Sequence, residues 1–163
     1  NRRVRRKRRN MLKIFFGIAI VISSFFVGKS LTGVYKKREE FFANLLKFNA
    51  ELKRNLIFKR ESVTDIISSD KDYEPFGKIY DKINFGEIPA YPAYLKPEQI
   101  KFVEEYLSSL GKRNRETEEE FLSYGESAIG GELENCSLEN KKYKNLGEKL
   151  GLSFGLIVFV LIL

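Results

Sequence analysis

Residues 41–59 read FFANLLKFNAELKRNLIFK, and their apolar side chains recur with the period of an α-helix. Successive apolar positions are three or four residues apart, which places them along one helix face. The central stripe consists of Phe41, Leu45, Phe48, Leu52 and Leu56, and Phe42, Leu46 and Ile57 widen it. No stretch of comparable strength alternates between apolar and polar residues, as a half-buried β-strand would. The sequence therefore predicts an all-α fold built around this helix.

An apolar segment precedes the amphipathic helix, and no proline separates the two. Residues 14–27, IFFGIAIVISSFFV, carry no charge, and Lys13 and Lys29 bracket them. From Met11 to Leu31 the chain is long enough to span about 30 Å as a helix, the thickness of a bilayer's hydrocarbon core. We expect residues 11–31 to form an N-terminal transmembrane helix. A cleaved signal peptide is the alternative, but no small-residue cleavage site follows.

The positive charge is concentrated in residues 1–10, NRRVRRKRRN. Seven of the 29 basic residues lie there, so the remaining 22 balance the 22 acidic residues of the chain. The net charge of +7 is therefore no evidence for a nucleic-acid-binding domain. Met11 is the only methionine. We expect translation to start there, with residues 1–10 outside the native protein; a native basic arm that binds a membrane surface or nucleic acid is the alternative.

Shorter helices are predicted after residue 61. Ser62 and Asp65 have the spacing of a capping box, which would open a helix over 63–69. A third amphipathic stretch runs from Phe76 to Ile83. Residues 86–97 contain three prolines and form a loop, whose Tyr91 and Tyr94 are candidates either for protein contact or for packing over the helices.

Pro97 suits the first position of the next helix, and Gly111 suits its C-terminal cap. A long helix is predicted over 116–149, with a kink or break at Gly130–Gly131. The acidic residues among 116–120 match the helix dipole, and we expect them to be solvated.

A second apolar run, LGLSFGLIVFVLIL, covers residues 150–163. It is apolar on every side towards its end, which disfavours a half-exposed helix of a water-soluble domain. We therefore expect residues 146–163 to form a C-terminal transmembrane helix. Residues 32–145 would then form a bundle of about five to six helices between two transmembrane helices.

Basic residues flank both apolar runs on the sides that face the middle of the chain: Lys29, Lys36, Lys37 and Arg38 after the first, and Lys141, Lys142, Lys144 and Lys149 before the second. If translation starts at Met11, the positive-inside rule places the bundle in the cytoplasm. If residues 1–10 are native, their charges argue for the opposite topology. A membrane-anchored sensory or signalling protein with an extracytoplasmic helical domain is then the alternative function.

Few catalytic chemistries are open to this composition. The chain has no histidine and one cysteine, which removes histidine-dependent nucleophile pairs, disulfides within the chain and Cys-cluster metal sites. Residues 28–30, GKS, match the end of a phosphate-binding loop, but they lie in the predicted membrane helix rather than between a strand and a helix. The sequence therefore predicts a protein that is not an enzyme and has no catalytic residues, cofactor, metal or small-molecule substrate.

The order of several short patterns resembles one protein family over residues 11–163. They are MLKI at 11–14, the helix over 36–60 with SVTD at 62–65, LxxLGxxxRE at 107–116, and KYKxLG at 142–147 before the last apolar run. Together they resemble stage III sporulation protein AB of endospore-forming bacteria. The resemblance implies a helical bundle like the cytoplasmic domains of the type II secretion inner-membrane platform protein.

The resemblance also implies a role and partners. The chain would be a platform subunit of the sporulation channel between mother cell and forespore, in the mother-cell membrane around the forespore. It would work with a secretion-type ATPase, stage III sporulation protein AA, and with other subunits of that channel; membrane lipid is the remaining partner, and no nucleic acid is expected. The candidate contact residues are basic groups expected at the far end of the bundle: Lys112, Arg113, Arg115, Lys59 and Arg60. Ordinary solvated turns are the alternative for them.

Overall fold

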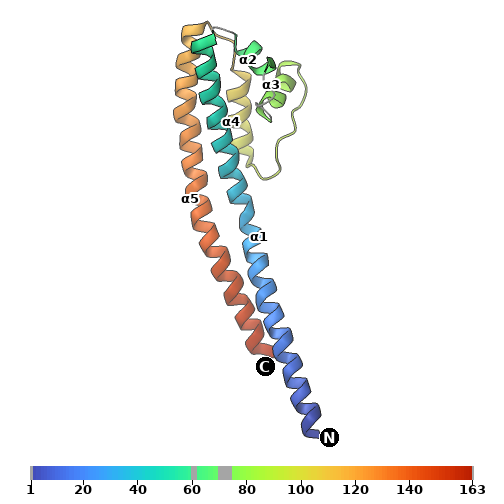
Figure 1. The fold of residues 1–163 in the computed structure, drawn as a ribbon. Helices are drawn as coiled ribbons and strands as arrows, with labels where there is room; N and C mark the ends of the chain where they lie inside the picture. Colours follow the sequence, from blue (N-terminus) through green and yellow to red (C-terminus); the bar gives the residue numbers. More distant parts are fainter. Residues whose placement is uncertain (1, 60–61, 70–74, 163) are drawn as a thin grey trace. The chain divides into compact units, whose positions relative to one another are not determined.

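The structure is a computed structural model that describes residues 2–59, 62–69 and 75–162. These residues form five helices and no strand: α1 (Arg2–Lys59), α2 (Val63–Ser69), α3 (Phe76–Asn84), α4 (Pro97–Ser108) and α5 (Arg115–Ile162) (Figure 1). The all-α prediction is confirmed. The two apolar runs are not separate helices, because α1 and α5 each continue through them without a break.

The chain forms two compact units. We call residues 37–136 the helical domain, and the remaining parts of α1 and α5, up to residue 36 and from residue 137, the terminal helix pair. The boundaries expected at residues 31/32 and 145/146 fall inside α1 and α5, where no break in the helix marks them.

The core of the helical domain is built on the predicted stripe of α1. Phe41, Leu45, Phe48, Leu52 and Leu56 are all buried, together with Phe42. Side chains from α2 to α5 cover this stripe: Val63, Ile66, Phe76, Ile79, Val103, Leu107, Leu122 and Ile129 are the main ones. Ile57, which was expected to widen the stripe, is 36% exposed, so that expectation is wrong.

Local signals start the short helices as predicted. The hydroxyl of Ser62 accepts a hydrogen bond from the backbone N–H of Asp65 at 3.2 Å and donates one to its carboxylate at 2.6 Å, which caps α2. Pro97 is the first residue of α4. Gly111 lies two residues beyond the C-cap Ser109 and has φ +72°, a conformation that favours glycine. Gly111 was predicted to cap the end of α4, but the C-cap is Ser109 and Gly111 lies in the turn that follows.

A buried polar cluster joins three helices of the domain. The Tyr106 hydroxyl on α4 donates a hydrogen bond to Asn49 Oδ1 on α1 at 2.6 Å. Asn49 Nδ2 in turn donates to the backbone carbonyl of Leu122 on α5 at 3.0 Å. Asn49 is fully buried and Tyr106 is 6% exposed. Burial raises the pKa of Tyr106 far above its ordinary value of 10.0, and the charge of Glu118 adds to the shift.

Of the kink or break expected at Gly130–Gly131, the break is wrong, because α5 is helical through both residues. Glycine disfavours a helix interior by about 1 kcal/mol per residue. Packing on either side outweighs this cost, since Ile129 and Cys136 are buried in the core and Leu133 packs against it. Cys136 is 2% exposed, as expected for a core residue.

In the terminal helix pair, α1 and α5 are antiparallel and their backbones touch. A Cβ atom placed on Gly28 would lie 2.5 Å from the carbonyl oxygen of Gly147, and one on Gly151 would lie 2.7 Å from that of Ser24. Gly147 and Gly151 are four residues apart on α5, so they lie on one face of that helix and allow the close approach. The residues GKS at 28–30 therefore belong to a helix that packs against another helix, which is not the geometry of a phosphate-binding loop.

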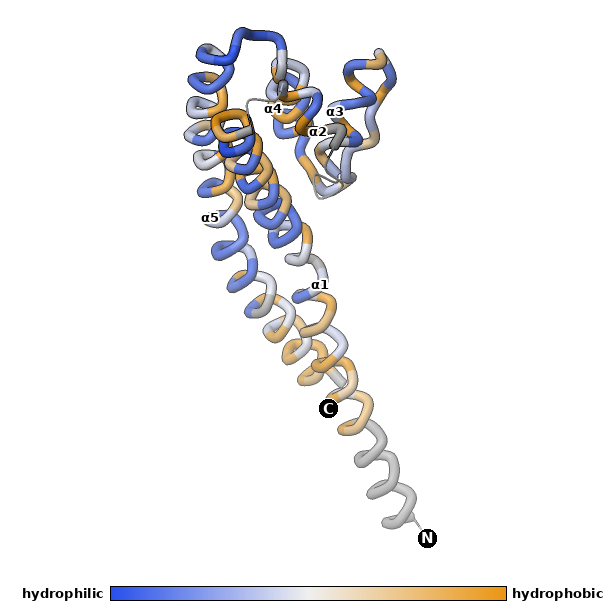
Figure 2. The backbone as a smooth tube through the Cα atoms, turned by 45° about the horizontal axis from the view of Figure 1, so that its top comes forward, coloured by the Kyte–Doolittle hydropathy of each residue, from blue (hydrophilic) through white to orange (hydrophobic). Residues whose placement is uncertain are grey.

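Within the terminal helix pair, hydrophobic residues predominate towards the end of α5 and along the neighbouring part of α1 (Figure 2). Among the described residues, α1 is the one helix long and apolar enough to cross a membrane, judged by length and composition. The second transmembrane helix, expected over residues 146–163, stays a prediction.

Candidate functional site

The candidate contact residues lie where α1 ends and where α4 turns into α5. Lys112 and Arg113 are in the α4–α5 turn, and Arg115 is the first residue of α5. Arg115 Nη2 donates a hydrogen bond to the backbone carbonyl of Ile57 at 2.8 Å, so the turn and the last residues of α1 adjoin. Lys59 is the last residue of α1, and Arg60 lies outside the described residues. We call Lys112, Arg113 and Arg115 the basic turn.

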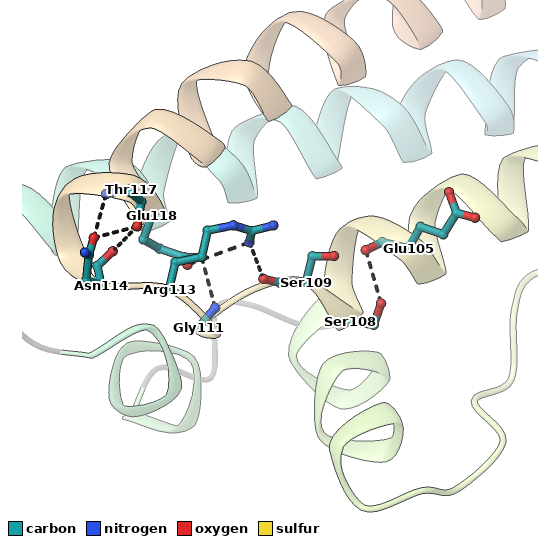
Figure 3. A network of polar contacts seen from close by, with 8 residues as sticks. All are labelled: Glu105, Ser108, Ser109, Gly111, Arg113, Asn114, Thr117 and Glu118. Carbon is teal, nitrogen blue, oxygen red and sulfur yellow. Dashed lines mark hydrogen bonds and ion pairs between the residues drawn. The ribbon is translucent and has the colours of Figure 1, made fainter.

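Arg113 contacts three groups of its own domain, of which Figure 3 shows Ser109 and Glu118. Its Nη1 donates to the backbone carbonyl of Ser109 at 2.6 Å and lies 4.0 Å from Glu118 Oε2. Its guanidinium carbon lies 3.9 Å from the centroid of the Phe121 ring, a cation–π geometry. The side chain is nevertheless 36% exposed. Arg113 therefore stabilises the turn and offers only part of its guanidinium to a partner.

Glu118 was expected to be solvated with the other acidic residues of its helix turn, and that expectation is wrong. Its side chain is 2% exposed. Oε1 accepts a hydrogen bond from the backbone N–H of Gly111 at 2.9 Å, while Oε2 accepts none among the described residues and faces Arg113. The left-handed turn at Gly111 directs this N–H towards the start of α5. The carboxylate is thus part of the turn's internal structure, where a buried charge needs its partners.

Asn114 begins α5. Its side-chain oxygen accepts a hydrogen bond from the backbone N–H of Thr117 at 3.0 Å, which is the N-cap arrangement. This cap was not predicted from the sequence, although an asparagine three residues before a threonine at the start of an acidic stretch is a usable signal. Glu118 also had a signal, because it lies four residues before the core residue Leu122 on the same helix face.

A pocket of about 270 Å³ opens beside the basic turn. Arg113, Arg115 and Glu118 line it together with apolar and small residues that include Leu56 and Val63. Arg113 and Arg115 are exposed, and Lys112 beside them in the α4–α5 turn is exposed as well. This surface therefore suits an acidic group of a partner. The described residues include no three Asp, Glu or Cys side chains that are placed to hold a metal ion.

The proline-rich loop packs on the domain. The Tyr94 ring lies 6.5 Å from that of Phe41, centroid to centroid, and the Tyr94 carbonyl accepts a hydrogen bond from Arg38. Burial raises the pKa of Tyr94 and of Tyr91, with smaller contributions from nearby glutamates. Both tyrosines therefore pack over the helices, and their contact with another protein stays a prediction.

Comparison of the chain with known protein families, with curated proteins and with solved structures finds no significant match.

Proposed function

We propose that the protein is a non-enzymatic membrane platform, held in the bilayer by both ends of the chain. The observation that carries this proposal is the terminal helix pair. Its two helices touch along glycines, and they leave large apolar side chains facing outward. Phe15 is 74% exposed and Phe26 is 62% exposed on α1; on α5, Phe154 is 64% exposed and Val160 is 69% exposed.

Such a surface is unfavourable in water. Contiguous exposed apolar side chains mark a membrane or protein contact rather than a solvated face. In lipid, by contrast, helices associate through close backbone packing at small residues, because burial of apolar surface gives no advantage there. Both features support a pair of helices in a bilayer. The apolar segment of α5 is the shorter one, and local thinning of the bilayer would accommodate it.

The proposed orientation places the helical domain in the cytoplasm. Exposed lysines at both junctions support it, since cytoplasmic flanks carry an excess of basic residues. Lys36 and Lys37 belong to the α1 junction, and Lys141 and Lys144 to the α5 junction. The alternative, a sensory protein, would have the domain outside the cytoplasm.

The proposed partner is a secretion-type ATPase that binds the basic turn. The resemblance to stage III sporulation protein AB suggests the sporulation channel of the mother-cell membrane around the forespore as the setting, and stage III sporulation protein AA as the ATPase. The exposed cations of the basic turn support an electrostatic contact, which accelerates association and fixes its register.

A pull-down with the purified ATPase tests this contact. We expect the double variant Lys112→Glu, Arg115→Glu to bind less ATPase than the parent, with a larger loss at low salt because exposed charges are screened at high salt. The control is Lys47→Glu, Lys82→Glu, which makes the same charge change at exposed positions on α1 and α3. Equal binding by both double variants, with unchanged helicity, would remove the basic turn as the contact.

A further inference from the structure

A groove of about 630 Å³ runs along one side of the terminal helix pair. Tyr35 and Tyr143 line one end, where their rings stack at 4.3 Å between centroids, and Phe16 and Phe154 line it towards the other. Both helices contribute to its walls, which are mostly apolar.

The groove follows from the sizes of neighbouring side chains. Ala19 and Ser23 are small and line it on α1, between the larger Phe16 and Val27. On the α5 side, Leu150 stands beside the glycines that touch α1. Small residues beside a close helix crossing thus leave a recess that no side chain of the described residues fills.

Two lysines border this recess on α5. Lys142 and Lys149 are exposed and lie four residues before and three residues after Leu146, which lines the groove. This spacing brings both lysines next to the groove face of the helix. The Lys142 ammonium lies 5.6 Å from the centroid of the Tyr143 ring, at the tyrosine end of the groove. An apolar groove therefore has a positively charged rim.

We propose that this groove binds one acyl chain of an anionic phospholipid, whose headgroup lies at Lys142 and Lys149. The inference rests on the proposed membrane insertion of the terminal helix pair. Lysines near the surface of a bilayer attract anionic headgroups, while their stems reach along apolar surface. Tyrosines are also common at the level of the headgroups, which agrees with the stacked pair at this end.

A second copy of the chain is the less suitable occupant. Two copies in one membrane share their topology, so a symmetric interface brings residues of equal depth together. The lysine rims of both copies would then face each other and repel. An anionic lipid neutralises the same rim instead.

The experiment uses the purified full chain in a neutral detergent and native mass spectrometry. Phosphatidylglycerol and phosphatidylcholine with identical acyl chains are titrated separately. We expect phosphatidylglycerol to bind several-fold more tightly, because one lysine near an anionic surface changes affinity about fivefold. Lys142→Gln, Lys149→Gln should lose this preference. Lys141→Gln, Lys144→Gln makes the same charge change on other faces of α5 and should keep it.

A second pair of variants tests the groove itself. Ser23→Phe fills the groove and should weaken binding of both lipids, whereas Ile22→Phe changes the adjacent exposed position outside the groove and should not. Equal affinity for the two lipids, equal effects of the matched variants, or a dimer that excludes lipid would each overturn the inference. Extraction of the membranes with alkaline carbonate distinguishes failure of the proposed membrane insertion from failure of the proposed lipid site. Release of the chain contradicts membrane insertion. A chain that stays in the membrane but shows no lipid preference contradicts the lipid site alone.

Discussion

The hydrogen bond between Tyr106 and Asn49 is expected to be a major local contribution to the stability of the helical domain. Tyr106→Phe removes a hydroxyl whose bond to Asn49 Oδ1 is 2.6 Å long and leaves that acceptor buried. An unsatisfied buried polar group costs about 1–3 kcal/mol. We expect the free energy of unfolding to fall by this amount. Tyr124→Phe is the control, because Tyr124 is 72% exposed, and it should change stability by less than about 0.5 kcal/mol.

A double-mutant cycle isolates the bond itself. Asn49→Leu also destabilises, since it leaves the Tyr106 hydroxyl buried without this acceptor. Combining the two substitutions removes donor and acceptor together, so the double variant should cost less than the sum of the single variants by at least about 1 kcal/mol. Additive costs would refute the view that this bond, rather than packing, makes the two residues important.

Urea unfolding of residues 37–136, followed by circular dichroism, supplies the measurement. In the part of the chain that the structure describes, the buried core side chains all lie within this range, from Phe41 to Cys136. We therefore expect the isolated helical domain to fold and to unfold cooperatively. A strand-rich spectrum or a transition without cooperativity would contradict the fold itself.

Three further predictions concern the core, its pH dependence and the terminal helix pair. Leu52→Asp should prevent folding of the domain, because Leu52 is fully buried and a lone charge there costs several kcal/mol. Ala50→Asp, on the exposed face of α1, should leave a folded domain, and circular dichroism distinguishes the two outcomes. The free energy of unfolding should be unaffected by Tyr106 below pH 10 and fall as the pH rises above it, because the unfolded chain then loses the Tyr106 proton that the folded chain retains. Urea titrations at pH 9 and about pH 11 should show a smaller decrease in this free energy for Tyr106→Phe than for the parent. Gly151→Leu should reduce cross-linking between cysteines placed at facing positions of α1 and α5, since its Cβ meets the α1 backbone, whereas Gly33→Leu, with nothing within 4 Å of its Cβ, should not.

Helix positions and most of the core were predictable because they depend on local signals. The period of the α1 stripe, the Ser62 cap and Pro97 each act within a few residues along the chain. These signals do not depend on what packs against the helix. They therefore identify the elements and their buried faces without knowledge of the tertiary structure.

The features that could not be predicted from the sequence depend on contacts between distant residues. Glu118 looks like its solvated neighbours, and only the folded turn supplies Gly111 and Arg113 as its partners. Gly130–Gly131 has a poor local propensity, but packing of the adjacent turns keeps the helix intact. The close contact between Gly28 and Gly151 requires both terminal helices to be placed side by side. The basic turn was placed correctly in the chain, but the internal contacts of Arg113 and Arg115 appear only in three dimensions.

Thiol labelling at residue 88 tests the proposed membrane platform most directly. Ile88 is 93% exposed in the helical domain, and Cys136→Ala removes the native thiol. In a bacterial host, Ile88→Cys should resist a membrane-impermeant maleimide in intact cells and react after permeabilisation, as a cytoplasmic domain requires. Full labelling in intact cells would place the domain outside the cytoplasm, contradict the platform and favour the sensory alternative.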